Sequence, residues 1–507
     1  MIQLDGNSLT LDQLRAIADG ELVGVAPGVH EKVTASNRIV EKLVEENRVV
    51  YGITTGFGHL CNTHIDRADL ERLQTNLIRS HATGVGDFFT REEVRAMIAI
   101  RVNSLLHGVS GVRMQVIESL LGLINKDVIP CVPQQGSVGS SGDLAPLSHI
   151  MLVLMGEGEV LDPTSLSRCA PAAPALAKAG LSPLSLKAKE GLALINGTAV
   201  MTGVFGLALE RALVVAKTAD LIGGMTLEVL KGSTAPFDPE FIALRPYPGM
   251  KNVAANVVAV TADSAVCESH IGCTRVQDAY SLRCIPQVHG ATREALNHLV
   301  TQVTLEMNAV TDNPILLSED KIISGGHFHG QPMALTADYF GISISELGNI
   351  SERRIDRLLN PLISGLNPFL TANPGVNSGL MIVQYTAASL VSENKILAHP
   401  ASVDSIPTSA YQEDHVSMGT IAARKGARIL DHVTQVLAIE LICAAQAYEY
   451  VKPLALGKGT GPAYEFLRRS VLPLTEDRVM TADLAAAKRM IGKGELLNHV
   501  EQYVKLR

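Results

Sequence analysis

The sequence predicts a mainly α-helical protein with a smaller, mixed region at its N-terminal end. Helix signals recur along the chain, the segments after Lys187 are long and very apolar, and one stretch alone has a clear strand pattern. Of the 507 residues, 47% are hydrophobic but only 4% are aromatic, so aliphatic side chains must supply most of a large core. We expect an N-terminal domain over residues 1–199, and a helical bundle domain with a C-terminal helical extension over residues 200–507.

Three helices are predicted in the N-terminal region. Thr10 and Gln13 have the spacing of a capping box and open a helix that ends near Gly20. Thr90 and Glu93 open a second helix in the same way. The leucines of "RADLERLQTNLIRSH" recur at helical spacing and place one apolar face on a third.

Two segments of this region have a loop composition. Residues 126–143 are rich in Pro, Gly, Gln and Ser, which predicts a loop. Residues 162–183 are rich in Pro and Ala, and they are the best candidate for an excursion or a domain boundary.

The second half of the chain predicts a central bundle. A helix that is apolar on most faces is buried among other helices, and surplus apolar surface indicates oligomerisation. The stretch "GLALINGTAVMTGVFGLALE" is interrupted by Asn196, Thr198 and glycines, so we expect a core helix and not a membrane span. The strand signal, "PILLSEDKIIS", predicts two short strands around an acidic turn. Helices are expected over residues 200–230, 290–310, 331–358, 378–397 and 414–450.

Charge and cysteine content limit the partners and the compartment. The net charge of −8 has no basic stripe, so a nucleic acid partner is not expected. The N-terminus "MIQLDGNSLT" lacks the basic start and apolar run of a signal peptide. Seven scattered cysteines without a dense framework suit a reducing compartment. We expect a soluble, cytoplasmic protein.

Three short stretches are candidates for chemistry. "SVGSSGDLAP" places Ser141 between glycines, but a nucleophile elbow needs G-x-S-x-G between a strand and a helix, and the final glycine is absent. A glycine-rich turn that caps a helix beginning near Asp143 is the ordinary explanation. "CESHIGC" has too few ligands for a closed zinc site, so no metal is expected, and "GKGTG" lacks the strand and spacing of a phosphate loop.

Several other stretches place polar side chains where a core should be apolar. A buried polar group must find hydrogen-bond partners, so each island needs an explanation. Taken singly, each has a capping or solvent-exposed role, but together they indicate a polar site. The islands contain Tyr51 in "VVYGITTGFG", Asn196 in "ALINGTAV", Gln277, Tyr280 and Arg283 in "VQDAYSLRCIPQ", and Gln412, Glu413, Asp414 and His415 in "SAYQEDHVSMG".

With these islands in order, "GSVGSSGDLAPLSH" closely resembles the signature of the aromatic amino acid ammonia-lyases. The stretches "YGITTGFG", "RSHATG", "LINGT", "QDAYSLRCIPQV", "DNP", "FHG" and "QEDHVSM" are similar to the family's other motifs in order and spacing. The resemblance covers essentially the whole chain. Within the family, "SHATG" and "QEDHVSM" resemble the members that act on histidine.

The resemblance implies that Ser140-Ser141-Gly142 cyclises autocatalytically into a 4-methylidene-imidazol-5-one (MIO). In that reaction the amide nitrogen of Gly142 attacks the carbonyl carbon of Ser140. Water is lost, including the Ser141 hydroxyl, which leaves an exocyclic methylidene group on the ring. A glycine suits the attacking position because its backbone has an open conformational space. No external cofactor is then required.

The resemblance also assigns roles to the polar islands. Tyr51 is expected to remove the β-proton of the substrate. A phenol has an ordinary pKa near 10, so cationic or hydrogen-bonded surroundings must lower it. Arg283 is expected to hold the substrate carboxylate as a bidentate fork, helped by Asn196. Tyr280 and Gln277 are expected to order the site around the electrophile.

The remaining expected residues contact the substrate ring. Phe328 is expected to form a wall of the site, and Gln412 is a further substrate-binding candidate. His81 and Glu413 are expected to recognise an imidazole, because a carboxylate accepts a hydrogen bond from the ring N–H. A phenyl ring in its place would leave Glu413 desolvated and unpaired.

The implied function is non-oxidative elimination of ammonia from L-histidine, giving urocanate, by a homotetramer whose sites are shared between chains. The sequence departs from the family pattern at Thr54, His327 and Tyr411, where Asn is usual or frequent, and at Ser140, where Ala is common. Alternative substrates are therefore a modified histidine, or else tyrosine or phenylalanine. An aminomutase of the same family is an alternative activity. A catalytically silent helical scaffold is the alternative of a different class.

Overall fold

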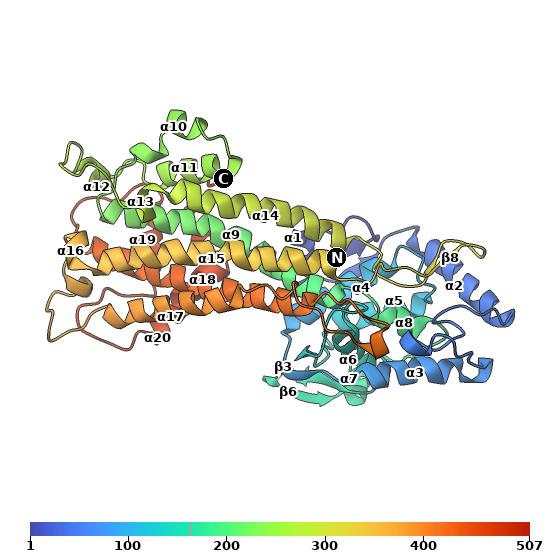
Figure 1. Ribbon diagram of the computed structural model, residues 1–507. Coiled ribbons are helices and arrows are strands. Elements are labelled where there is room, and N and C mark those ends of the chain that lie inside the picture. The colour runs from blue at the N-terminus through green and yellow to red at the C-terminus, as the bar shows by residue number, and fades with distance from the viewer. Residues whose placement is uncertain (163–164) are drawn as a thin grey trace. The chain divides into compact units, whose positions relative to one another are not determined.

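The computed structural model describes residues 1–162 and 165–507 (Figure 1). The described part divides into two compact units. Unit 1 comprises Met1–Leu207, Val300–Asp338 and Pro400–Arg424, and unit 2 comprises Ala208–Leu299, Tyr339–His399 and Lys425–Arg507. The sequence predicted one division at 199/200, whereas the chain returns twice to unit 1. Four of these crossings lie inside long helices, where the helical periodicity continues and no local signal marks them, and the fifth, at 399/400, lies in a loop.

Unit 1 contains the described strands and eight of the shorter helices. Its helices are α1 (Leu11–Asp19), α2 (Val29–Glu45), α3 (Leu70–His81), α4 (Arg91–Leu105), α5 (Met114–Asn125), α6 (Leu144–Leu154), α7 (Ala172–Lys178) and α8 (Glu190–Ile195). Its strands form two-stranded sheets: β1 (Ile2–Leu4) with β2 (Val23–Val25), β3 (Val85–Phe88) with β4 (Pro133–Gln135), β5 (Glu159–Asp162) with β6 (Ser165–Pro171), and β7 (Ile315–Leu316) with β8 (Ile322–Ile323).

The predicted helix starts of unit 1 are confirmed. Thr10 accepts a hydrogen bond from the backbone of Gln13, whose side chain bonds back to the Thr10 backbone. Thr90 and Glu93 form the same reciprocal pair at the start of α4. The third predicted helix is α3, which buries one face of its leucine-rich sequence.

The strands were predicted in part. The two short runs of "PILLSEDKIIS" form β7 and β8, which pair antiparallel as expected. The strands β1 to β6 were not predicted, because most have only three or four residues and alternation is not visible over so short a run. Of the Pro- and Ala-rich stretch 162–183, the described part forms β6 and α7 and stays inside unit 1, so it is not a domain boundary. Residues 163 and 164 lie outside the described residues.

Four long helices cross from one unit to the other along the chain: α9 (Ala199–Val229), α14 (Ile285–Met307), α15 (Gln331–Leu359) and α18 (Gly419–Tyr448). The other helices of unit 2 are α10 (Pro239–Ala243), α11 (Pro248–Val260), α12 (Ala265–Glu268), α13 (Tyr280–Arg283), α16 (Pro361–Ser364), α17 (Met381–Leu397), α19 (Thr460–Arg468), α20 (Thr481–Gly492) and α21 (Glu495–Val500).

Within unit 2 the long helices pack as the predicted bundle, running alongside one another in Figure 1. Glu440 of α18 accepts hydrogen bonds from Thr226 of α9 (2.7 Å) and from Arg354 of α15 (2.5 and 2.8 Å). His432 of α18 bonds to Asn394 of α17 (2.9 Å). These buried polar contacts fix which faces of the helices meet.

The last predicted helix begins later than expected. The sequence predicted it from Asp414, but α18 begins at Gly419. Met418 has a φ of +57°, which a helix does not allow. The Ser417 hydroxyl donates to the carbonyl oxygen of Gly139 (3.0 Å). Residues 414–418 are thus held against the loop before Ser140 instead of forming the first turn of the helix.

Two helices, α9 and α18, are long and apolar enough to cross a bilayer by length and composition. From the sequence, we expected residues 191–210, which include the start of α9, to form a core helix and not a membrane span. Burial separates the two cases, since 78% of the most apolar window of α9 and 89% of that of α18 are buried inside the protein. Such burial is typical of core helices.

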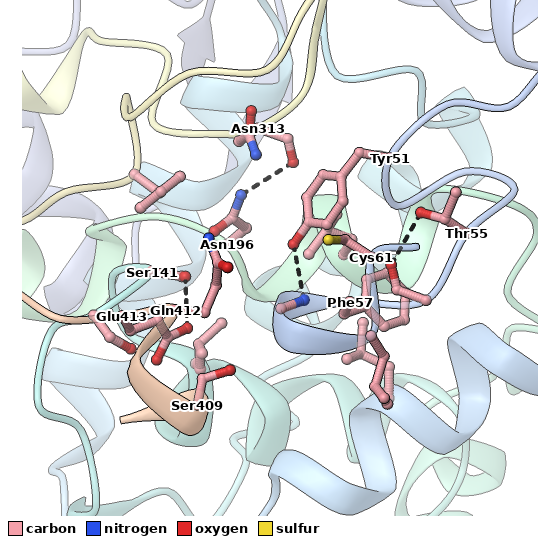
Figure 2. Close-up of a pocket in the computed structure, with 18 of the residues that line it drawn as sticks. Tyr51, Thr55, Phe57, Cys61, Ser141, Asn196, Asn313, Ser409, Gln412 and Glu413 are labelled. Carbon is pink, nitrogen blue, oxygen red and sulfur yellow. Dashed lines mark hydrogen bonds between the residues drawn. The ribbon is translucent and has the colours of Figure 1, made fainter. Parts of the chain in front are cut away.

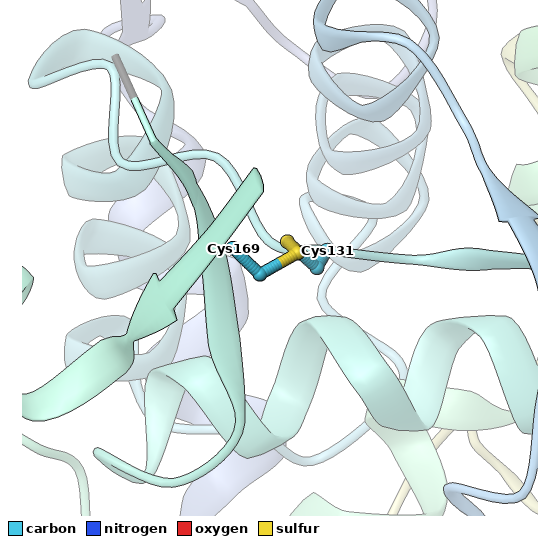
Figure 3. The surroundings of a disulfide bond; sticks show 2 residues. All are labelled: Cys131 and Cys169. Carbon is cyan, nitrogen blue, oxygen red and sulfur yellow. A yellow bond between two sulfur atoms is a disulfide. The ribbon is translucent and has the colours of Figure 1, made fainter. Parts of the chain in front are cut away.

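The structure pairs Cys131 with Cys169 in a disulfide (Figure 3). No cysteine pair was predicted from the sequence. The N–H of Cys131 donates to the carbonyl oxygen of Glu159 on β5 (2.9 Å). Cys169 lies on β6, opposite Leu161 of β5. The hairpin therefore brings the two cysteines together across 38 residues, a separation that no sequence spacing reveals.

Candidate active site

Unit 1 contains a cavity of about 1120 Å³. Segments far apart in the sequence line it: the 49–65 loop, α3, the loop before α6, the end of α8, and residues 313–329 and 409–415. Many of the residues singled out in the sequence therefore meet in one place (Figure 2). Those that line the cavity are Tyr51, His81, Ser140, Ser141, Asn196, Phe328, Gln412, Glu413, Asp414 and His415.

The serine–glycine loop lies between β4 and α6 and is clamped by Gly197. The N–H of Gly197 donates to the carbonyl oxygen of Ser141 (3.1 Å), and the N–H of Asp143 donates to that of Gly197 (2.7 Å). Gly142 has a φ of +80°, and a Cβ there would lie 2.0 Å from the Gly197 carbonyl oxygen, so only glycine fits. Among the described residues, none accepts a hydrogen bond from the Gly142 N–H.

Asp143 anchors this loop to the start of α9. Its fully buried carboxylate accepts hydrogen bonds from the N–H groups of Val200 and Met201 (both 2.9 Å), from the hydroxyl of Thr420, and from that of Ser137 (3.4 Å). Burial raises the pKa of Asp143 to about 6, although the hydrogen bonds oppose that shift. The aspartate thus caps the helix and holds the loop from one end.

Tyr51 lies half-buried in the cavity wall. Its phenolic oxygen accepts a hydrogen bond from the N–H of Gly58 (3.3 Å). Burial raises the pKa of Tyr51, the Gly58 bond lowers it, and the nearby Cys61 and Glu413 raise it further. From the sequence, we expected surroundings that lower this pKa. Unit 1 supplies the hydrogen bond but surrounds the phenol with acidic groups, so the expected lowering is wrong for this unit.

His81 ends α3 at the cavity. Its Nδ1 lies 2.8 Å from the carbonyl oxygen of Leu77, which only accepts, so Nδ1 carries the proton and Nε2 is left as an acceptor. Burial lowers the pKa of His81, which favours this neutral form.

Glu413 is held by a short, tightly turned segment. Its Oε2 accepts a hydrogen bond from the Thr408 hydroxyl (2.7 Å), and the two residues also pair through their backbones. Between them Ser409, Ala410 and Tyr411 all have positive φ angles, which non-glycine residues rarely adopt. Glu413 Oε1 accepts a hydrogen bond from the hydroxyl of Ser141 (3.3 Å), so the carboxylate faces the serine–glycine loop.

Three of the expected site residues lie in unit 2 and do not line this cavity. The Arg283 guanidinium donates to Gln277 (2.8 Å) and lies 4.7 Å from the centre of the Tyr280 ring. Gln277 and Arg283 line a second cavity of about 350 Å³ in unit 2. The Tyr280 side chain is exposed. The polar islands therefore form two groups within one chain.

The positions where the sequence departs from the family pattern do not line the cavity, except Ser140. The Thr54 hydroxyl is buried and donates to the carbonyl oxygen of Arg48 (2.6 Å). Tyr411 is 79% exposed, and His327 is not among the lining residues, although its neighbours Phe328 and His329 are. The structure thus gives no reason for Thr54, His327 or Tyr411 to change the substrate.

Sequence reasoning missed several residues of the site. Thr408, which positions Glu413, has no pattern of its own, and Cys61 lines the cavity without any motif that singled it out. Asn313 and His329 also line the cavity; they lie in the quoted motifs "DNP" and "FHG" but were given no role. In "CESHIGC", the ring nitrogens of His270 lie 3.1 and 3.2 Å from backbone carbonyl oxygens, which gives this histidine a structural role.

With this geometry in view, the fold and the site define a class of protein. A profile described as "Aromatic amino acid lyase" matches residues 9–469. The chain belongs to the aromatic amino acid lyase family, whose members are carbon–nitrogen lyases and related enzymes, and it is itself a carbon–nitrogen lyase.

Full-length relatives give a finer comparison. The chain is 50% identical to a histidine ammonia-lyase of Alkaliphilus metalliredigens over 100% of this chain and 99% of that one, and 52% identical to one of Symbiobacterium thermophilum over 98% and 97%. Its structure is similar to a histidine ammonia-lyase of Trypanosoma cruzi (TM-score 0.92, 40% identity, covering 99% and 96%). It is also similar to a tyrosine aminomutase of Streptomyces globisporus (TM-score 0.94, 37% identity, covering 100% and 99%).

Proposed function

We propose that the protein is a histidine ammonia-lyase, which eliminates ammonia from L-histidine to give urocanate in histidine catabolism. The observation that carries this proposal is Glu413, a carboxylate fixed by Thr408 and facing the serine–glycine loop. It offers a hydrogen-bond acceptor to the N–H of an imidazole ring, and Nε2 of His81 is a further acceptor in the same cavity. The full-length similarity to histidine ammonia-lyases supports the same substrate.

The loop fits the formation of the MIO electrophile from Ser140, Ser141 and Gly142. The attacking atom, the amide nitrogen of Gly142, makes no hydrogen bond among the described residues, while the N–H of Asp143 beside it does. Cyclisation joins that nitrogen to the carbonyl carbon of Ser140, whose oxygen leaves as one water. The hydroxyl and the α-hydrogen of Ser141 leave as a second water. The side chain of Ser140 stays outside the ring, so its difference from the common Ala does not prevent closure. The finished group supplies an electrophile that no ordinary side chain offers, which activates the amino group for departure.

Tyr51 acts as the general base for the β-proton. Its phenol must be ionised for this, yet burial and acidic neighbours raise its pKa in unit 1. A positive charge from outside the unit is therefore needed. Arg283 carries such a charge and binds the substrate carboxylate, while Tyr280 and Gln277 order the electrophile. Phe328 and Gln412 contact the substrate from the cavity wall.

The active enzyme is a homotetramer in which one chain provides Tyr51 and the electrophile and another provides Arg283. Unit 1 by itself holds Tyr51 and the serine–glycine loop but not Arg283, which supports a site completed by residues from elsewhere. Complementation tests it. Tyr51→Phe and Arg283→Ala variants should be inactive alone, but co-expressed chains should regain part of the activity, because some mixed sites carry neither substitution. Mixed tetramers without activity would contradict shared sites.

We further propose a cytoplasmic enzyme that needs no external cofactor, metal, nucleic acid or membrane. The negative net charge without a basic stripe and the similarity to bacterial histidine ammonia-lyases support this assignment.

Substrate assays test the proposed function. The purified protein should release ammonia from L-histidine far faster than from L-phenylalanine or L-tyrosine, with urocanate as the product. A β-amino acid product would favour the aminomutase alternative, for which the similarity to a tyrosine aminomutase is the observation. A protein that turns over no amino acid and is unaffected by borohydride would instead be a silent scaffold.

A further inference from the structure

A fully buried ion pair lies behind the cavity and has no role in the function described so far. Lys189 Nζ lies 2.9 Å from Asp312 Oδ2, and both side chains are completely buried. Removing two charges from water is costly, so such a pair needs a reason to persist. Lys189 also has a φ of +71° at the start of α8, a conformation that is unfavourable for a lysine.

The pair connects directly to Asn196 at the end of the same helix. The Asn196 Nδ2 donates to Asp312 Oδ1 (3.4 Å) and to the carbonyl oxygen of Asn313 (3.1 Å; Figure 2). The Arg101 guanidinium donates to the backbone carbonyl oxygen of Asn196 (2.7 Å). Both the side chain and the backbone of Asn196 are therefore held from behind the cavity.

These contacts determine which end of the amide faces the substrate. An ionised carboxylate and a backbone carbonyl only accept hydrogen bonds, so the atom that points at them must be the amide nitrogen. Its two hydrogens are used there. Among the described residues none donates to Asn196 Oδ1, and Asn196 lines the cavity. The group that Asn196 offers to a ligand is thus an acceptor.

The charge on Asp312 is essential to this orientation. Burial raises the pKa of Asp312, but the charges of Lys189 and Arg101 lower it more, so the carboxyl stays ionised. A protonated carboxyl group or an amide at position 312 carries a hydrogen-bond donor of its own. The Asn196 side chain is then more stable with its amide rotated, so that Oδ1 faces position 312.

We propose that the Lys189–Asp312 pair positions Asn196, and that Asn196 accepts a hydrogen bond from the ammonium group of the substrate through Oδ1. This inference rests on the proposed function, since it takes an amino acid as the ligand. It differs from the sequence expectation that Asn196 helps Arg283 to hold the carboxylate, because a carboxylate needs a donor.

Two histidine analogues separate these roles. Histidinol keeps the ammonium group and lacks the carboxylate, whereas imidazolepropionate keeps the carboxylate and lacks the ammonium group. Their inhibition constants against L-histidine turnover are measured for the wild type and for Asn196→Ala. Histidinol should bind to the variant at least about tenfold more weakly, because a hydrogen bond to a charged group is lost. Imidazolepropionate should change by less than about twofold. A loss confined to imidazolepropionate, or equal for both, would overturn the inference.

The positioning role is tested at Lys189 and Asp312. Asp312→Asn and Lys189→Met should each raise the inhibition constant of histidinol relative to that of imidazolepropionate, although neither residue touches the ligand. A general folding defect lowers the active fraction but leaves this ratio unchanged. Glu190→Gln is the matched control, because it removes a buried charge paired with Arg113 (2.8 Å) at the start of the same helix without touching Asn196. An unchanged ratio in both test variants, or an equal shift in the control, would contradict the positioning role.

Failure of the inference is distinguishable from failure of the proposed function. A wild type that does not turn over L-histidine contradicts the proposed function and the inference with it. An active enzyme in which Asn196→Ala weakens only the carboxylate analogue contradicts the inference alone.

Discussion

Glu413→Gln should lower the turnover of histidine much more than that of phenylalanine. Glu413 Oε2 is taken by the Thr408 hydroxyl (2.7 Å), so Oε1 is the oxygen left for the substrate. Its present partner is the Ser141 hydroxyl (3.3 Å), which is lost when the electrophile forms. Oε1 is then available to accept the imidazole N–H as a charge-assisted hydrogen bond.

The magnitude follows from that single bond. A hydrogen bond to a charged group contributes about 1.5–3 kcal/mol, which corresponds to roughly tenfold to a hundredfold in kcat/KM. Glutamine keeps the size of the side chain and an oxygen for Thr408, but it removes the charge. Phenylalanine has no ring N–H, so its turnover should fall little, or rise because an unpaired buried charge is gone.

The assay compares kcat/KM for both amino acids in the wild type and the variant, with the absorbance of the electrophile as the control for cyclisation. Equal losses on both substrates, with that absorbance unchanged, would refute the assignment of Glu413 to ring recognition.

Three further predictions concern Thr408, Asp143 and the Cys131–Cys169 disulfide. Thr408→Val should reduce histidine turnover about tenfold, because Glu413 loses its 2.7 Å bond, and Thr408→Ser should restore it; a Val variant with full activity would contradict this role. Burial raises the pKa of Asp143 to about 6 from 3.8, so the folded protein binds this proton more tightly than the unfolded chain. The stabilisation is fully present below about pH 3.8 and is lost as the pH rises through about 6, an effect of up to about 3 kcal/mol. The free energy of unfolding of Asp143→Asn, measured in urea, should not show this loss between about pH 3.8 and 6. The same pH dependence in the wild type and the variant would contradict the prediction. Cys169→Ser should cost up to about 4 kcal/mol of unfolding free energy, because the disulfide with Cys131 closes a loop of 38 residues. A reductant that lowers the melting temperature of the wild type but not of the variant would agree, whereas equal melting temperatures of the two proteins without reductant would not.

Local signals in the sequence predicted what depends on neighbouring residues. The capping boxes at Thr10 and Thr90 form as expected, because both partners lie within one helical turn. The two strands of "PILLSEDKIIS" pair as expected because a short turn joins them. Features that depend on distant segments were not predicted. The pairing of Cys131 with Cys169 requires the β5–β6 hairpin, and no spacing reveals it.

The candidate site shows the same limit. The motifs named Tyr51, Asn196 and Glu413, and all three line one cavity. The sequence did not show that Arg283 lies in another unit, because motif order carries no distances. It also did not single out Lys189, whose relevance comes only from its contact with Asp312.

The mass of the native chain tests the central claim, which is that Ser140, Ser141 and Gly142 become the electrophile of an ammonia-lyase. The account predicts an intact wild-type chain lighter by about two waters than its sequence, after reduction of the disulfide. The loss should map to the peptide that contains residues 140–142. Ser141→Ala should lack that modification and the activity while keeping the fold. A fully active native protein with the mass of its unmodified sequence would contradict the account.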